Sequence, residues 1–138
     1  SIMKDVISLF RKFNNYSTYS DYELSNYLFP SIKLNQYKKH YNENNLIGFT
    51  NWALLSDKAE NKILSSQPFN DEDWNSGNNL WHIETVSLTN VKKIISWSKN
   101  NLASKYGVNR LVKWIRVNNN KIRTIKKVYS KDSWLWVE

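Results

Sequence analysis

The sequence of 138 residues contains no cysteine, and its only histidines are His40 and His82. Without cysteine, disulfide bonds and zinc–thiolate centres are excluded. Two histidines are too few for a multi-histidine site, so we expect no bound metal. The three glycines, Gly48, Gly77 and Gly107, lie far apart. This spacing excludes a P-loop, a Gly-rich pyrophosphate loop and a Gly-x-Ser-x-Gly nucleophile turn.

Long hydrophobic runs are also missing, so no segment is predicted to span a membrane. The N-terminal residues 1–4 lack the apolar core of a secretory signal. Together with the lack of cysteine, this favours a cytoplasmic location. The length suits one compact domain over residues 1–138.

Acidic residues are outnumbered, because 20 Lys and Arg face 12 Asp and Glu, a formal net charge of +8. A surplus of this size favours an acidic partner: nucleic acid, an anionic membrane or an acidic carrier protein. Aromatic residues interleaved with basic strands could stack bases. However, the sequence shows no helix-turn-helix, zinc pattern or RNP-like motif, which argues against nucleic acid.

Hydrophobic spacing predicts alternating helices and strands. The predicted helices cover residues 3–13, 21–29, 57–66 and 91–106, and the predicted strands cover 34–41, 46–55, 80–87, 111–117, 121–129 and 134–137. Ser20 and Glu23 form a capping box, and Pro30 is expected to end the second helix. We therefore expect an α/β fold with a mostly antiparallel central sheet flanked by helices. It is compatible with an acyltransferase sheet of the GNAT type.

Three segments carry unusual motifs: residues 30–37 (PSIKLNQY), 48–55 (GFTNWALL) and 73–81 (DWNSGNNLW). Their order and spacing resemble the RTX toxin-activating lysine acyltransferases, the haemolysin C-type family, over roughly residues 16–128. The matching residues are Pro30, Ile32, Asn35, Gln36, Tyr37, Trp52, Ala53, Leu55, Asp73, Trp74, Ser76, Gly77 and Trp81. The resemblance implies transfer of a fatty acyl group from acyl carrier protein to an internal lysine of a protoxin or small peptide. It further implies an acyl-phosphopantetheine donor on the carrier, no permanently bound cofactor, and a possible homodimer.

In that family, a histidine near the end of the first helix and an aspartate after the second tryptophan carry the chemistry. Counted without gaps, these positions hold Tyr16 and Glu84 here. Tyr16 either donates a hydrogen bond to the thioester or oxyanion, or packs as an aromatic residue with its hydroxyl at the surface. Alternate strand residues share a face, so we predict that His82 lies beside Glu84 and acts as the base. The alternative is that His82 fills a half-buried sheet position.

The motif tryptophans have two interpretations. Trp52, Trp74 and Trp81 either fill the core or wall an acyl channel with the turn residues Ser76 and Gly77. Basic residues cluster late in the sequence and are predicted to bind the acidic carrier and its phosphate. The residues assigned to carrier binding are Arg110, Lys113, Arg116 and Arg123.

Two further functions stay open. A homologue that has lost catalysis would still bind acyl carrier protein or a client protein, because a fold can outlive its chemistry. The basic charge also leaves a nucleic-acid-binding protein as an alternative.

Overall fold

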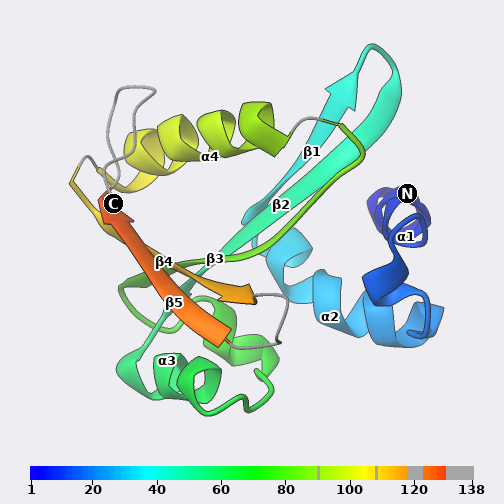
Figure 1. Ribbon diagram of the computed structural model, residues 1–138. Coiled ribbons are helices and arrows are strands. Elements are labelled where there is room, and N and C mark those ends of the chain that lie inside the picture. The colour runs from blue at the N-terminus through cyan, green and yellow to red at the C-terminus, as the bar shows by residue number, and fades with distance from the viewer. Residues whose placement is uncertain (90, 108, 118–122, 130–138) are drawn as a thin grey trace.

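The computed structural model describes residues 1–89, 91–107, 109–117 and 123–129 (Figure 1). The elements are α1 (Ile2–Phe10), the 3₁₀ turn η1 (Asn14–Tyr16), α2 (Asp21–Lys33), β1 (Tyr37–Asn42), β2 (Asn45–Leu55), α3 (Asp57–Leu64), the 3₁₀ turn η2 (Asp71–Trp74), β3 (Asn79–Ser87), α4 (Val91–Tyr106), β4 (Leu111–Val117) and β5 (Arg123–Tyr129). In this described part of the chain, no helix combines the length and apolar character needed to cross a bilayer.

The central sheet has the strand order β1-β2-β3-β4-β5. All neighbours are antiparallel except β3 and β4, which run parallel. The prediction of an α/β fold with a mostly antiparallel sheet flanked by helices is therefore confirmed. Both predicted hairpins are also present, as β1–β2 and β4–β5. The strand predicted at 134–137 lies outside the described residues.

The predicted end of the second helix at Pro30 is wrong. The capping box of Ser20 and Glu23 is present, but α2 continues through Pro30 to Lys33. A proline removes one N–H donor and its ring crowds the preceding turn, but the carbonyl of Pro30 still accepts the N–H of Leu34 at 3.1 Å. The helix ends just before Asn35, whose φ of 56° is left-handed.

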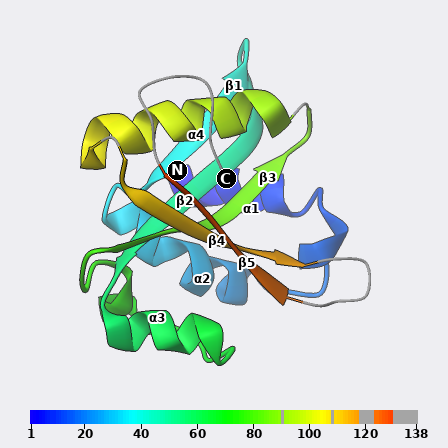
Figure 2. The ribbon, with the colours of Figure 1, turned by 60° about the vertical axis from the view of Figure 1, so that its left-hand side comes forward.

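Alternate residues of β2 divide the helices between the two faces of the sheet. Phe49 packs with α1 and α2, and Ala53 packs with Ala59 of α3. Trp52 points the other way and packs with Leu102 of α4. We call these the α1–α3 face and the α4 face. Figure 2 shows α4 on one side of the sheet, away from α2 and α3.

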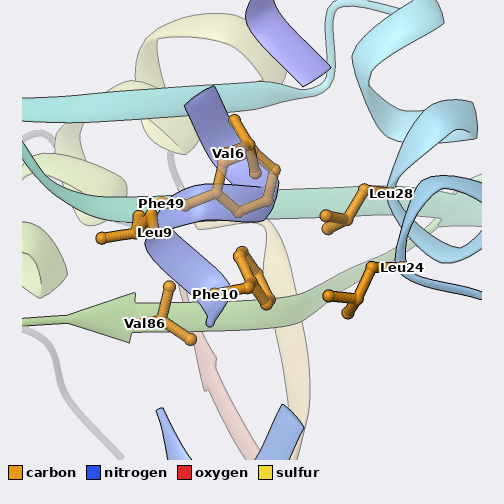
Figure 3. Packing of buried hydrophobic residues seen from close by; sticks show 7 residues of the cluster. All are labelled: Val6, Leu9, Phe10, Leu24, Leu28, Phe49 and Val86. Atoms are coloured by element: carbon orange, nitrogen blue, oxygen red, sulfur yellow. The ribbon is translucent and has the colours of Figure 1, made fainter. Parts of the chain in front are cut away.

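The largest apolar cluster lies on the α1–α3 face (Figure 3). Its buried members are Val6, Leu9, Phe10, Leu24, Leu28, Phe49 and Val86. They come from both helices and two strands, so the cluster ties α1 and α2 to the middle of the sheet. Truncating one of its phenylalanines to alanine is expected to cost about 3–5 kcal/mol.

A β-bulge interrupts β3 next to β2. Asn51 pairs with Glu84, whereas the adjacent Trp52 pairs with His82. Ile83 is therefore an extra residue opposite a single step of β2. One extra residue reverses the alternation of side chains along the rest of the strand.

Candidate active site

Tyr16 and Glu84 are 68 residues apart in sequence and in contact in the structure. The Tyr16 hydroxyl donates a hydrogen bond to Oε1 of Glu84. The Tyr27 hydroxyl donates to Oε2 of the same carboxylate at 2.6 Å. Both oxygens of Glu84 thus accept a phenol, and the three residues form the Tyr16–Glu84–Tyr27 cluster.

Local contacts hold Tyr16 at this place. The Arg11 guanidinium pairs with Asp21 at 2.5 Å and also donates to the carbonyls of Tyr16 and Tyr19. The ring of Phe10 meets the Tyr16 ring edge-on, with centroids 4.9 Å apart. The turn η1 between α1 and α2 therefore presents the Tyr16 hydroxyl to β3.

Burial dominates the electrostatics of the cluster. It raises the pKa of Glu84 above its ordinary value, although the hydrogen bonds from Tyr16 and Tyr27 oppose that shift. Burial, followed by the charge of Glu84, raises the pKa of both phenols. Near neutral pH the phenols are therefore donors, and Glu84 is the group that can exchange a proton.

Asn51 is the cross-strand neighbour of Glu84 and is fully buried. Its Nδ2 donates to the Ser31 hydroxyl at 3.0 Å. Its Oδ1 has no hydrogen-bond partner among the residues that the structure describes. Cross-strand neighbours have Cβ atoms about 5 Å apart. The residue paired with Glu84 therefore carries an open acceptor.

The predicted pairing of His82 with Glu84 is wrong, because the bulge at Ile83 intervenes. Glu84 faces the tyrosines of the α1–α3 face, whereas His82 shares the α4 face with Thr85. The His82 Nδ1 lies 3.4 Å from the Thr85 hydroxyl. The two side chains thus occupy opposite faces of the sheet.

Both histidines belong to the α4 face. Burial, followed by the charge of His40, lowers the pKa of His82 to about 4. Burial, followed by the charge of Lys38, lowers the pKa of His40 to about 4. The His40 Nε2 lies 3.1 Å from the Thr50 hydroxyl. Both imidazoles are therefore neutral at physiological pH.

The three sequence motifs meet through the side chain of Gln36. Its Nε2 donates to the carbonyls of Trp52 and Trp74, each at 3.1 Å. The Ser76 hydroxyl accepts the N–H of Ser56 at 2.9 Å. Gln36 therefore hydrogen-bonds two backbone carbonyls, and Ser76 hydrogen-bonds a backbone N–H at a turn. Both motif residues have a structural role.

The turn around Gly77 leaves no space for a side chain. A Cβ at this position would lie 2.5 Å from the Cα of Ser56, so only glycine fits. Asp73 accepts the Lys62 ammonium at 2.6 Å and the N–H of Asn70 at 2.7 Å. The segment 73–81 thus fixes α3 against β2.

The motif tryptophans are core residues. Trp52, Trp74 and Trp81 are 1%, 3% and 1% exposed. The Trp52 indole donates to the Tyr106 hydroxyl at 2.9 Å, and the Trp81 indole donates to Glu60 at 2.7 Å. They pack on both faces of the sheet. Their role as walls of an acyl channel stays a prediction.

The predicted carrier-binding residues do not share one surface. The Lys113 ammonium is paired with Glu60 at 2.8 Å, and Arg110 donates to a backbone carbonyl of the turn before β3. Arg116 is exposed, but it lies three residues along β4 from Lys113 and so on the opposite face. The side chain of Arg123 lies outside the described residues.

Strands β3 and β4 pair over only a short length. The strands pair only at Leu80–Val112 and Trp81–Lys113, and then diverge (Figure 1). Beyond Trp81, no described strand pairs with β3 on this side. Ile83 and Glu84 therefore lie in the part of β3 that has no described partner strand on the β4 side.

Sequence reasoning missed Tyr27, Asn51 and Gln36 as site or support residues. A signal existed for Tyr27, because it lies three residues after Leu24 on the buried stripe of α2. For Asn51, a polar residue within the apolar segment 48–55 was the available signal. Among the described residues, no group of three potential His, Asp or Glu ligands gathers as a metal site would require.

Comparison with known proteins agrees with this arrangement. A protein of Synechocystis sp., described as uncharacterized, is 29% identical over 123 residues, which cover 86% of this chain and 81% of that protein. A model of the RTX toxin acyltransferase family matches residues 1–129, a span that includes Tyr16, Glu84 and all three motifs. This match supports acyltransferase chemistry on a toxin substrate. The chain belongs to the RTX toxin acyltransferase family.

Proposed function

We propose that the protein transfers a fatty acyl group from acyl carrier protein to a lysine of a protoxin or small peptide. The Tyr16–Glu84–Tyr27 cluster would supply the base. One observation carries this assignment: the two positions expected to be catalytic, Tyr16 and Glu84, meet in a hydrogen bond. The acyl-phosphopantetheine arrives with the carrier as a substrate.

The acceptor amine must first lose a proton. A free lysine has a pKa of about 10.4 and is protonated at neutral pH. In the proposed step, the lysine passes a proton to the Tyr16 oxygen as Tyr16 passes its own to Glu84. The neutral amine then attacks the thioester carbon, the C–S bond breaks, and the departing sulfur leaves as a thiol after taking the second amine proton. An amide and a free phosphopantetheine thiol result.

The edge of β3 beyond Trp81, which no described strand pairs on the β4 side, would hold the thioester. An extended phosphopantetheine arm carries amide groups that can pair with an unpaired strand edge, as an added strand does. A bulge directs backbone N–H groups out of the ladder, and such donors stabilise a tetrahedral oxyanion. The bulge at Ile83 lies next to Glu84, so both functions would act at one point.

Asn51 is proposed to position the acceptor lysine. It pairs with Glu84 across the two strands, and its Oδ1 has no partner among the described residues. A buried amide with an open acceptor favours a ligand that brings an N–H donor. The lysine amine meets that requirement.

A binding-only role is the second candidate, and one observation favours it. Both oxygens of Glu84 already accept hydrogen bonds from phenols, so the carboxylate is engaged within the fold before any ligand binds. Such a protein would bind the carrier or a client protein without turnover.

Intact-mass spectrometry separates the two candidates. The protein is mixed with acyl carrier protein bearing a medium or long acyl chain and with the toxin or peptide encoded beside its gene. An acyl mass on an acceptor lysine supports the enzyme. A stable carrier complex without transfer supports the binding-only role.

A further inference from the structure

Charge is strongly segregated along the chain. Residues 85–131 contain twelve of the 20 Lys and Arg residues and none of the 12 Asp and Glu residues. This stretch comprises the end of β3, α4 and the β4–β5 hairpin. Helix α4 therefore carries only cationic and neutral side chains.

A basic pocket of about 380 Å³ lies between β1 and the first turns of α4. Its lining residues include three lysines, two aromatic residues and no carboxylate: Lys38, Lys39, His40, Tyr41, Ile47, Thr89, Lys93, Ile94 and Trp97. The Lys38 ammonium lies 5.7 Å from the Trp97 ring centroid, and the Lys39 ammonium lies 5.6 Å from that of Tyr41. Neutral His40 at the pocket adds no charge of its own.

Exposed apolar side chains occur around the start of α4, outside the pocket lining. Leu88, Val91 and Ile95 are 43%, 41% and 42% exposed. Val91 and Ile95 are four residues apart and share one flank of α4. Lys93 lies two residues after Val91, on the flank that lines the pocket. Lysines and apolar residues therefore surround the first two turns of the helix.

We propose that this surface, the α4 docking face, binds the acidic, partly apolar helical face of acyl carrier protein. It combines the pocket residues Lys38, Lys39, Lys93 and Trp97 with the exposed apolar residues around the start of α4, Leu88, Val91 and Ile95. The inference rests on the proposed function, which makes the carrier the donor. It moves the carrier away from Lys113, which is paired with Glu60.

Charge complementarity selects a protein partner. Lysines are mobile point charges that suit dispersed carboxylates, whereas tight phosphate recognition favours the bidentate fork of arginine. The pocket lining contains no arginine. The exposed apolar residues around the start of α4 would bury surface against a protein but not against a free anion.

The location also suits delivery of the acyl arm. Helix α4 follows β3 after a short connection, so its first turn stands at the end of β3 that no described strand pairs on the β4 side. A carrier seated there would lie at the same end of β3 as the unpaired edge that leads toward Glu84.

The test measures the dissociation constant for acyl carrier protein charged with a medium acyl chain, at low and at physiological salt. The variant Lys38→Glu/Lys93→Glu reverses two exposed charges of the docking face. The variant Lys12→Glu/Lys58→Glu makes the same change in net charge with exposed lysines elsewhere. We expect at least about tenfold weaker binding for the first pair at low salt and little change for the second.

A second variant, Ile95→Ser, removes exposed apolar surface without a charge change. Its binding is expected to weaken by a factor that salt hardly alters. Equal weakening by both lysine pairs, or none by the Lys38/Lys93 pair, would overturn the docking face.

Transfer measured in parallel separates this inference from the proposed function. Normal binding by the docking-face variants, with active wild-type protein, overturns only the docking face. A wild-type protein that binds anionic vesicles or RNA, but neither binds the carrier nor transfers acyl groups, overturns both.

Discussion

The two faces of β3 bury polar groups in different ways. On the α1–α3 face, both oxygens of Glu84 accept hydrogen bonds from tyrosines. On the α4 face, the titratable His82 has a buried Nε2 without a partner among the described residues. The same holds for Ser98 Oγ and Asn101 Nδ2 on this face, and for Asn51 Oδ1 on the other. A single extra residue at the bulge sends neighbouring titratable groups into these two environments.

This difference shows what hydrogen bonds add to burial. Burial disfavours the charged form on both faces, so it raises the pKa of Glu84 and lowers that of His82. Only Glu84 has donors that oppose the shift. The carboxylate therefore stays able to ionise, whereas the imidazole is held neutral.

The largest effect on acyl transfer is expected from a substitution of Glu84 on the α1–α3 face. Glu84→Gln is expected to lower acyl transfer by about 10²–10⁴-fold, because an amide cannot accept the lysine proton. His82→Gln, on the opposite face, is the matched control and should leave transfer within about one order of magnitude. Initial rates from intact-mass spectra measure both. A loss of acyl-transfer rate in His82→Gln as large as that in Glu84→Gln would instead point to His82, on the α4 face, as the base.

Acid should destabilise the α4 face. The pKa of His82 falls from 6.5 to about 4 in the folded protein. Folding thus favours neutral His82, and this stabilisation is complete above pH 6.5 and is lost as the pH falls toward 4. The full shift corresponds to roughly 3 kcal/mol. Urea unfolding at several pH values should show the loss in the wild type and a smaller one in His82→Gln. Equal slopes in the two proteins would contradict the prediction.

Removing one hydrogen-bond donor to Glu84 tests whether this carboxylate titrates during the reaction. Tyr27→Phe deletes a hydrogen bond that lowers the pKa of Glu84, so that pKa should rise. A hydrogen bond to a charged group contributes about 1.5–3 kcal/mol, so the acid limb of the pH–rate profile should move up by roughly 1–2 pH units. The rate at high pH should be largely retained. An unmoved acid limb would mean that Glu84 does not titrate in the reaction.

The smallest effect is expected at Ser98, which is 3% exposed. Its hydroxyl has no hydrogen-bond partner among the described residues. Ser98→Ala should therefore be neutral or stabilising by up to about 1 kcal/mol. Chemical denaturation measures the change. A loss above about 1 kcal/mol would indicate that the hydroxyl is satisfied in solution, for example by a buried water.

Much of the fold could be predicted from local patterns. The capping box at Ser20, the hairpin β1–β2 and the left-handed Gly107 that ends α4 all follow from residue type and spacing. The continuation of α2 through Pro30 could not be predicted in this way. It depends on whether the turn after the proline packs against the rest of the protein. Ser31 in that turn is fully buried.

The candidate site, like the fold, could be predicted only in part from the sequence. The sequence by itself determined which residue types occupy the two family positions, Tyr16 and Glu84, and its motifs carried the resemblance to the family. Only the tertiary structure placed Tyr27 on Glu84 and His82 on the opposite face. The reason is physical: strand alternation is a local rule, whereas a bulge arises from pairing with a neighbouring strand distant in sequence.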